Sequence, residues 1–361
     1  MINMVKLNPS FWNKKRVLIT GHTGFKGSWL SLWLSSLGAE VMGYALEPLT
    51  SPSLFNEANV ADHIHNASGD IRDYETLLSA TQNFCPEIIF HMAAQSLVRE
   101  SYINPVNTYE TNLMGTVNIL ETARHCKTVE TIINVTTDKC YENMELVRGY
   151  REEDRLGGRD PYSNSKACSE LVTQAYKDSF LSDKGIGVAT VRAGNVIGGG
   201  DWSTDRLIPD FFRAYNHNVA LQVRKPNAIR PWQYILEPLS GYMMLAERLQ
   251  RDPTLFSGAW NFGPIIQETK SVAWIVEYLS SNLQGAKWIS DEHPNHPHEA
   301  SILNLDISKV ADLLGWSPRL TLEETLSLCM NWNRDWTSDA DMSIVCLDEI
   351  TKFMAMERPV L

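Results

Sequence analysis

The sequence predicts an α/β protein with a doubly wound parallel sheet and a smaller C-terminal lobe. Three features lead to this prediction. Short apolar runs alternate with helix-like runs in the first half of the chain, a glycine-rich turn follows the first apolar run, and the second half is irregular. Short apolar strands that alternate with helices indicate a parallel sheet covered on both faces.

The alternation of strand-like and helix-like runs can be followed in chain order. Apolar runs predict strands at residues 16–20, 40–46, 87–94, 130–137 and 187–196, and helical patterns fall at 24–37, 74–84, 106–126 and 162–180. We predict no element for residues 51–71. Crossovers between parallel strands are almost always right-handed, so the helices should cover both faces of the sheet.

Composition and charge exclude several classes of protein. The chain has 361 residues and a net charge of −11, which argues against nucleic acid as a partner. The first 21 residues lack the apolar segment of a signal peptide, and no apolar run approaches the roughly 20 residues that span a bilayer. Six scattered cysteines form no metal-binding pattern, and the prolines of HPNHPH (293–298) favour a solvated loop. We therefore expect a cytoplasmic protein without a metal.

The stretch ITGHTGFKGSW contains three glycines, Gly21, Gly24 and Gly27, directly after the first predicted strand. One interpretation is a tight strand-to-helix turn, in which glycine is needed only for backbone conformation and packing. The alternative is a phosphate site at a helix N-terminus, where free N–H groups and the helix dipole attract an anion. The position between a strand and a helix favours a dinucleotide site.

The spacing G-x-x-G-x-x-G resembles the short-chain dehydrogenase/reductase superfamily, in its extended branch that modifies nucleotide sugars. The matching motifs are SGDIRD, HMAAQS, TYETNLMGT, TTDKCY, YSNSKACSE and RAGNVIGGGDW, and they span about residues 16–330. The resemblance implies a Rossmann-like NAD-binding domain at 1–195, to which the chain returns at about 236–264. The nucleotide-sugar lobe would comprise 196–235 and 265–361, although the tail after about 335 matches nothing.

The resemblance also implies which residues bind the cofactor, NAD. These are Gly21, Thr23, Gly24, Phe25, Gly27, Asp70, Ile71, Ala93, Ala94, Gln95, Asn112, Tyr162 and Lys166. The second strand lacks the aspartate that usually meets the adenosine ribose, and Glu47 either replaces it or is solvated. No arginine is placed to receive a 2′-phosphate, which favours NAD over its phosphorylated form.

Tyr162 and Lys166 stand four residues apart, so they share one face of a predicted helix. Such a pair is commonplace on protein surfaces. In the superfamily that this chain resembles, the lysine binds the nicotinamide ribose. Its charge and that of the nicotinamide lower the tyrosine pKa from about 10. The tyrosinate then takes a proton from a sugar hydroxyl, and the third member of the site corresponds to Thr137.

The segment Thr137-Asp138-Lys139 resembles the sugar 4,6-dehydratases, which have Thr-Asp-Glu, but a lysine replaces the glutamate. By this resemblance Asp138 protonates the departing 6-hydroxyl, for which burial should raise its pKa. Lys139 is either the base that removes the C5 proton or a cation that stabilises the enolate. We slightly prefer the base, and Glu142 or a bound water is the rival.

The TDK segment and its neighbours most resemble the branch members that act on CDP-glucose and supply dideoxyhexoses for bacterial O-antigen polysaccharides. By the family pattern, Arg230 meets the diphosphate, Asn195 and Arg206 are further substrate-binding residues, and Glu299 lies near the nucleotide. Another nucleotide sugar (dTDP-, GDP- or UDP-hexose), an epimerase, and a non-catalytic NAD-binding scaffold remain as alternatives.

The family usually dimerises through the two helices predicted at 106–126 and 162–180. These helices carry the apolar residues Val117, Leu120, Ala167 and Leu171, which serve either a partner or the protein's own sheet. The resemblance therefore implies a homodimer, and the sequence does not distinguish it from a tetramer.

Overall fold

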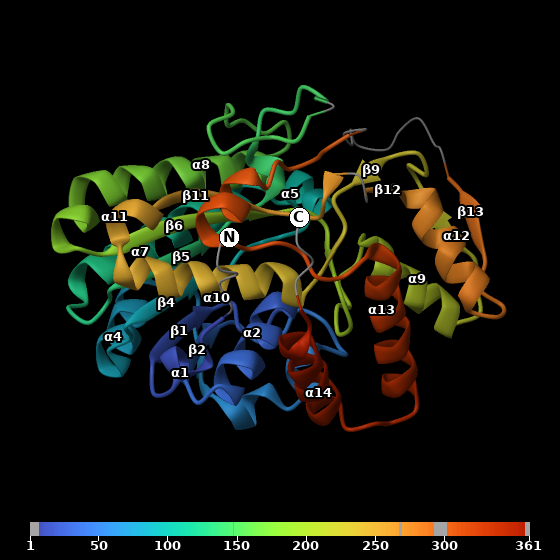
Figure 1. Cartoon of the computed structure of the whole chain (residues 1–361), viewed down its shortest axis with the longest axis horizontal. Helices are drawn as coiled ribbons and strands as arrows, with labels where there is room; N and C mark the ends of the chain where they lie inside the picture. Colours follow the sequence, from blue (N-terminus) through green and yellow to red (C-terminus); the bar gives the residue numbers. More distant parts are fainter. Residues whose placement is uncertain (1–6, 147, 267–268, 292–301, 358–361) are drawn as a thin grey trace.

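A computed structural model describes residues 7–146, 148–266, 269–291 and 302–357 of the chain. Its centre is a seven-stranded sheet in the order β11-β6-β5-β4-β1-β2-β3, and every pairing in it is parallel. The strands are β1 (Arg16–Thr20), β2 (Glu40–Ala45), β3 (His65–Ser68), β4 (Ile88–His91), β5 (Thr131–Val135), β6 (Gly187–Ala193) and β11 (Gly258–Phe262). The predicted fold class is confirmed (Figure 1).

Strand β1 lies at the point where the direction of winding reverses. Val17 is in register with Val41 of β2 on one side and with Ile88 of β4 on the other. From β1 the chain builds outwards to β3, then crosses to β4 and builds outwards in the opposite direction to β6. In open parallel sheets, ligands bind beyond the carboxyl ends of the strands at such a switch point.

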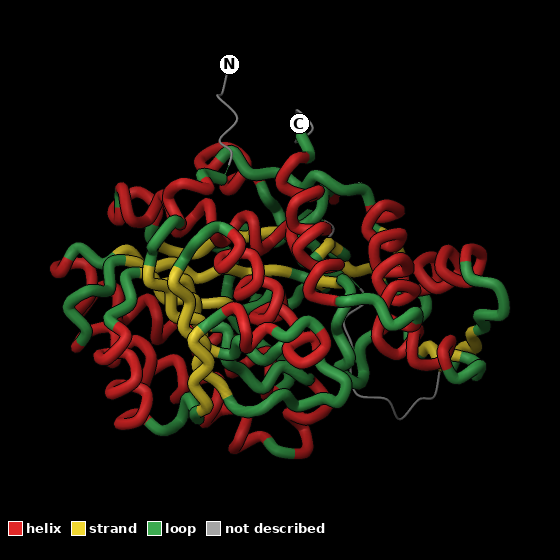
Figure 2. Tube along the Cα trace, turned by 90° about the horizontal axis from the view of Figure 1, so that it is seen from below, coloured by secondary structure: helices red, strands yellow, loops and turns green. Residues whose placement is uncertain are grey.

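Helices cover both faces of the sheet, and Figure 2 shows the strands between them. The alternation of side chains along β1 explains the two layers, because neighbouring residues of a strand point to opposite faces. Val17 and Ile19 pack into the core formed with α2 (Phe25–Ser36) and α10 (Leu236–Arg251). Leu18 packs into the opposite core, with α4 (Tyr74–Phe84) and α7 (Gly115–His125).

The helix predicted at 106–126 is present, but it contains an irregular turn. It consists of α6 (Pro105–Tyr109), the π-helical turn η2 (Glu110–Met114) and α7. The helix predicted at 162–180 is α8 (Pro161–Tyr176), which continues into the π-helical turn η4 (Lys177–Leu181). π-Helical turns within helices are frequent at functional sites, and η2 carries Asn112.

The segment 51–71, for which we predicted no element, contains three short ones. They are α3 (Leu54–Glu57), the 3₁₀ helix η1 (Val60–His63) and the edge strand β3. The sequence of β3, HNAS, is polar and mostly exposed, so it lacks the apolar run that identifies the inner strands. Other short elements are α1 (Pro9–Trp12), α5 (Val98–Ile103), η5 (Ser182–Lys184), α11 (Pro253–Phe256) and η7 (Val310–Leu314).

A third apolar cluster lies at one end of the molecule, away from the two cores that flank the sheet (Figure 1). It is built from α9 (Leu207–Asn216), α12 (Val272–Asn282) and α13 (Leu322–Thr337), with β7 (Val196–Ile197), β8 (Leu221–Val223) and Trp232. Three two-stranded pairings join β10 (Gln233–Tyr234) to β7, β12 (Lys270–Ser271) to β9 (Ile229–Arg230), and β13 (Trp288–Ser290) to β8. The exact division into two lobes remains a prediction.

The C-terminal helix α14 (Met342–Ala355), which matched no family motif, packs on the outer side of α2. The rings of Phe353 and Trp33 meet edge to face, with their centroids 5.8 Å apart. This contact covers the outer side of α2 and helps to explain why residues 27–34 are all buried. A helix that is largely apolar on every side needs such a cover. The tail therefore covers the helix that begins at the glycine turn.

Candidate active site

A cavity of about 970 Å³ opens between the sheet and the third apolar cluster. It lies beyond the carboxyl ends of β5 and β6, where the fold predicts a ligand site. Its lining includes Lys26, Thr137, Lys139, Tyr162, Asn195, Arg206 and Arg230. The structure thus brings most of the predicted catalytic and substrate-binding residues together around one space.

The glycine turn has the shape of a phosphate cradle. Gly21 has φ = +78°, and a Cβ atom there would lie 2.7 Å from the backbone nitrogen of Ala93. A Cβ atom on Gly27 would lie 2.2 Å from the carbonyl oxygen of Gly21, so neither position accepts a side chain. Gly24 caps α2 without a side chain, which leaves the N–H groups of the first helical turn accessible. These residues fit the pyrophosphate of a dinucleotide.

The neighbours of the glycine turn hold it in place. Phe25 begins α2 and packs against the main core, and the hydroxyl of Thr23 donates to the carbonyl oxygen of Leu46 at 2.9 Å. Glu47, one residue further on, is exposed. The carboxylate of Asp70 pairs with Arg72 at 2.6 Å, and this partner holds the pKa of Asp70 below its usual value.

Asn112 joins the cofactor segment to the helix that carries Tyr162. Its side-chain amide donates to the carbonyl oxygen of Gln95 and to the hydroxyl of Ser165, both at 2.9 Å, and its oxygen accepts from the backbone N–H of Gln95 at 2.8 Å. Asn112 is 1% exposed, so these bonds are sheltered from water. Ala93 and Ala94, which precede Gln95, are half-buried, and Ile71 packs beside Gly115 at the start of α7.

Thr137 and Tyr162 both line the cavity near the carboxyl end of β5. We expected neighbouring cations to lower the pKa of Tyr162. Within the chain, however, burial dominates and raises the pKa of Tyr162 to about 12, although the bond with Thr137 and the charge of Arg206 oppose it. The lowered pKa predicted from the sequence is therefore not produced by the chain's own groups.

Lys166 lies one helical turn after Tyr162 on α8 and is buried. Its ammonium donates to the carbonyl oxygen of Val135 at 3.0 Å, which fixes it beneath the end of β5. Burial lowers its pKa to about 8, and the carboxylate of Glu170 limits the shift. A lysine held in this way has donors left for another hydroxyl group.

Asp138 and Lys139 form the 3₁₀ helix η3 (Asp138–Cys140) just after β5. Asp138 has no exposed surface, and its Oδ1 accepts from the hydroxyl of Thr137 at 3.0 Å. The Nζ atom of Lys139 lies 3.4 Å from the same oxygen. The carboxylate of Glu142, the rival base, also lines the cavity but is paired with Arg155 at 3.2 Å and is 43% exposed.

A buried polar network supports this catalytic segment from below. Glu170 accepts hydrogen bonds from Thr136, Thr190 and Arg192, and the Arg192–Glu170 ion pair measures 2.8 Å with both side chains less than 5% exposed. Arg192 also donates to the hydroxyl of Tyr141 at 2.8 Å. Because Thr136 precedes the catalytic segment and Tyr141 follows it, the network fixes both of its ends.

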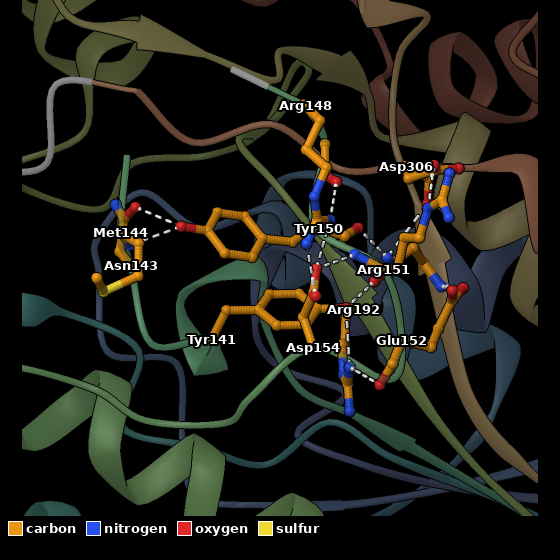
Figure 3. Close-up of polar contacts among 12 residues, drawn as sticks. Tyr141, Asn143, Met144, Arg148, Tyr150, Arg151, Glu152, Asp154, Arg192 and Asp306 are labelled. Atoms are coloured by element: carbon orange, nitrogen blue, oxygen red, sulfur yellow. Dashed lines mark hydrogen bonds and ion pairs between the residues drawn. The ribbon is translucent and has the colours of Figure 1, made fainter. Parts of the chain in front are cut away.

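The network continues into the wall of the cavity, as Figure 3 shows. The rings of Tyr141 and Tyr150 stack with centroids 5.1 Å apart, and the Tyr150 hydroxyl donates to Asn143 at 2.9 Å. An ion pair of 2.7 Å between Arg148 and Asp154 closes the loop between them. These contacts hold in place residues 141–145, which line the cavity.

The predicted substrate-binding residues are placed as follows. Arg206 bonds to Asp201 at 2.9 Å and to Ser96 at 3.0 Å, which aims its guanidinium at the cavity. Arg230 is 9% exposed and donates to the carbonyl oxygen of Ile229. The side-chain oxygen of Asn195 is buried without a hydrogen-bond partner among the described residues. Glu299 lies outside the described residues.

Two features of the site were not predicted from the sequence. The Arg192–Glu170 network joins residues 22 positions apart, and no local pattern announces it. Lys26 lines the cavity from the first turn of α2, and no sequence motif singles it out. A signal for Lys26 did exist, because a cation at a helix N-terminus opposes the helix dipole.

Comparison with known proteins agrees with this geometry. The fold is that of the extended short-chain dehydrogenase/reductase proteins that modify nucleotide sugars. Residues 18–329 match the model of the GDP-mannose 4,6 dehydratase family, and the chain belongs to this family. It is 51% identical to CDP-glucose 4,6-dehydratase of Salmonella typhimurium over 97% of this chain and 99% of the relative. It is 25% identical to dTDP-glucose 4,6-dehydratase of Xanthomonas campestris, over 88% of this chain and 94% of the relative.

Solved structures show the same fold. The dTDP-glucose 4,6-dehydratase of Bacillus anthracis, crystallised in complex with NAD, superimposes with a TM-score of 0.74 at 21% identity, covering 91% of this chain and 99% of that one. The UDP-glucose 4-epimerase of Thermus thermophilus, also in complex with NAD, gives a TM-score of 0.76 at 23% identity, covering 88% and 99%. Within the described residues, no helix has the length and apolar character needed to cross a bilayer.

Proposed function

We propose that this protein is a NAD-dependent CDP-glucose 4,6-dehydratase, which converts CDP-D-glucose to CDP-4-keto-6-deoxy-D-glucose and water. The observation that carries the proposal is the 51% identity, over nearly the full length of both chains, to the Salmonella enzyme of that name. The cavity with Tyr162, Thr137 and Lys139 supports it. The resemblance implies that the product is a precursor of the dideoxyhexoses found in bacterial O-antigen polysaccharides.

We propose NAD as the cofactor, held by the glycine turn, the Ala93–Gln95 segment and Asn112. When bound, NAD accepts a hydride from C4 of the sugar and returns it at C6, so it ends the cycle unchanged. The cradle that excludes side chains at Gly21 and Gly27 supports a pyrophosphate at the start of α2. Lys166, whose ammonium keeps free donors, would hold the nicotinamide ribose.

In the first half of the reaction, Tyr162 takes the proton of the 4-hydroxyl as hydride leaves C4. Thr137, which lines the cavity with Tyr162, would orient the same hydroxyl. Since burial raises the pKa of Tyr162 to about 12, the phenol needs an added cation to ionise near neutrality. The positive ring of the oxidised cofactor would provide that charge.

In the second half, water is lost across C5 and C6. The C4 ketone acidifies the C5 hydrogen, Lys139 removes it as a proton, and Asp138 protonates the departing 6-hydroxyl. When hydride returns to C6, the ammonium of Lys139 would give the proton back to C5, which completes the product. Asp138 is fully buried. Burial suits an acid that must give its proton to the substrate and not to water. Glu142 is a weaker choice of base because its carboxylate is engaged by Arg155 and is exposed.

We further propose that Arg230, Arg206 and Asn195 bind the substrate. The two guanidinium groups line the cavity and suit the oxygens of a diphosphate, and the unpartnered amide oxygen of Asn195 suits a sugar hydroxyl. Glu299 is retained as a proposal from the family pattern alone.

A cytoplasmic homodimer, or a tetramer built from such dimers, is also proposed. Leu120 and Ala167 are buried in the chain's own core, but Leu171 on α8 is 60% exposed and remains available to a partner. Sedimentation that detects only monomer at micromolar concentration would contradict the oligomer without affecting the proposed activity.

The substrate is tested by incubating the purified protein with CDP-, dTDP-, UDP- and GDP-hexoses. We expect the absorbance of a 4-keto sugar in base with CDP-glucose. Reaction with a different nucleotide sugar alone would overturn the substrate, and inversion at C4 without loss of water would indicate an epimerase. A protein that binds NAD but converts none of these sugars would instead be a scaffold.

A further inference from the structure

Lys26 occupies an unfavourable position for a cation. It stands in the first turn of α2, where the helix dipole is positive, and it lines the same cavity as several other cationic residues, among them Lys139 and Arg206. The charges of Arg206, Lys166 and Lys139 all act against its own, and Asp138 is the carboxylate that acts in its favour. Among the described residues, the side-chain ammonium of Lys26 has no hydrogen-bond or ion-pair partner.

A lysine in this position would be stabilised by an anion that the chain itself does not supply. The glycine cradle beside it excludes side chains but leaves the first N–H groups of α2 open. Gly24 caps the helix, and Lys26 follows two residues later, so its flexible side chain begins at the edge of this cradle. The anion that a cradle of this form accepts is a phosphate group.

We propose that Lys26 is a further cofactor-binding residue, whose ammonium pairs with the pyrophosphate of the dinucleotide at the N-terminus of α2. This inference rests on the proposed NAD-dependent function and deepens it. The backbone of the glycine turn positions the pyrophosphate, and Lys26 supplies a formal positive charge. The same ammonium, when paired, leaves Arg206 and Arg230 available to the second diphosphate, that of the nucleotide sugar.

Pairing with a pyrophosphate should change the protonation of Lys26. Burial, followed by the charge of Arg206, lowers the pKa of Lys26 to about 7, so at pH 8 its amine is mostly neutral in the free chain. A pyrophosphate beside it favours the ammonium and raises this pKa. Binding of the dinucleotide at pH 8 should therefore take up a proton at Lys26.

The proposal is tested by calorimetry with ADP-ribose, which has the pyrophosphate but lacks the nicotinamide cation, and with adenosine, which lacks the phosphates. Lys26→Met should weaken ADP-ribose binding by roughly 10- to 100-fold, the scale of one charge-assisted hydrogen bond. It should leave adenosine binding unchanged, and Lys26→Arg should retain most of the ADP-ribose affinity. Lys127→Met, which removes an exposed lysine, is the matched control.

Proton uptake is measured by repeating the ADP-ribose titration at pH 8 in buffers of different ionisation enthalpy. The wild type should take up a proton, and Lys26→Met should take up less, because Lys166, with a pKa of about 8, can contribute equally in both proteins. The wild-type measurement needs no variant, so it tests the proposal even if Lys26→Met fails to fold. No uptake by the wild type at pH 8 would overturn the proposal.

Other outcomes separate this inference from the proposed function. A wild type that binds neither NAD nor ADP-ribose contradicts the cofactor itself. A wild type that binds both, with Lys26→Met binding equally well, contradicts only the role of Lys26. If Lys26→Met weakens CDP binding and spares ADP-ribose, the amine serves the nucleotide sugar and the proposal is wrong.

Discussion

The Nζ atom of Lys139 lies 3.4 Å from Oδ1 of Asp138, a carboxyl group with no exposed surface. In the charged pair, neither group is ready for elimination, because the base must be neutral and the acid must carry a proton. Transfer of one proton from Lys139 to Asp138 produces both required forms at once, an amine and a carboxylic acid. The proposed elimination therefore depends on both residues together.

Replacement of Lys139 tests whether it is the C5 base. If it is, Lys139→Met should spare the oxidation at C4 and block exchange of the C5 hydrogen with solvent. A single-turnover experiment would follow the absorbance of the reduced nicotinamide and deuterium uptake at C5. If Lys139 only stabilises the enolate, a loss of roughly 10²- to 10³-fold is expected. Deuterium uptake at nearly the wild-type rate would exclude the base and direct attention to Glu142 or a bound water.

Tyr162→Phe removes the proposed acceptor of the 4-hydroxyl proton while retaining the ring. Turnover should fall by roughly 10²- to 10⁴-fold, the usual contribution of a positioned acid or base. NAD affinity should change little, because Lys166 keeps its bond to the carbonyl oxygen of Val135. Tyr74→Phe on α4, away from the cavity, is the control. Unchanged turnover in Tyr162→Phe would remove Tyr162 from the mechanism.

The Arg192–Glu170 pair should be essential for stability because it is buried. Arg192→Met leaves the carboxylate of Glu170 uncompensated, which typically costs about 3–5 kcal/mol of the free energy of unfolding. Urea unfolding measures this loss. Arg148→Met removes a cation from an exposed pair in the same part of the molecule and should change stability little. Equal midpoints for the two variants would show that burial does not decide the strength of these pairs.

Glu247 should make stability depend on pH. It is 5% exposed, and its Oε1 accepts from the indole of Trp12 at 2.9 Å and from the backbone N–H of Asn8 at 3.0 Å. Burial raises its pKa from 4.5 to about 7. The folded-state value is the higher one, so the contribution is complete below pH 4.5 and is lost as the pH rises through 7.

The expected loss between pH 4.5 and 7 is about 3 kcal/mol, from 1.36 kcal/mol per pKa unit. Urea unfolding of the wild type and of Glu247→Gln at pH 5, 6, 7 and 8 measures it. The amide retains an oxygen acceptor but does not titrate, so its profile should be flatter. Parallel profiles for the two proteins would show that Glu247 does not set this dependence.

The elements predicted correctly from the sequence are those whose buried residues form a continuous apolar run. The inner strands are continuous apolar runs because both of their faces are covered, and their parallel arrangement follows from their alternation with helices. The edge strand β3 escaped because its polar residues pair through the backbone at an exposed edge, which leaves no trace in side-chain hydrophobicity. The π-helical turn η2 escaped because its amphipathic pattern matches that of an α-helix.

The predictable part of the site consists of residues that lie within short motifs. Tyr162 and Lys166 are found in this way because they stand four residues apart on one helix, and Thr137 is found through the resemblance of its motif to those of the family. The ionisation of Tyr162 was not predictable, since it depends on burial by segments distant in the sequence. The same holds for Arg192 and Glu170, whose partnership depends on how β6 and α8 pack.

The most direct test of the proposed reaction follows the hydrogen on C4. The enzyme would be incubated with CDP-glucose that carries deuterium at C4, and the product would be examined by NMR and mass spectrometry. We predict the loss of one water molecule and deuterium in the new methyl group at C6, because hydride leaves C4 and returns to C6 of the same sugar. A product that keeps its water and has an inverted C4, or a methyl group without deuterium, would contradict the account.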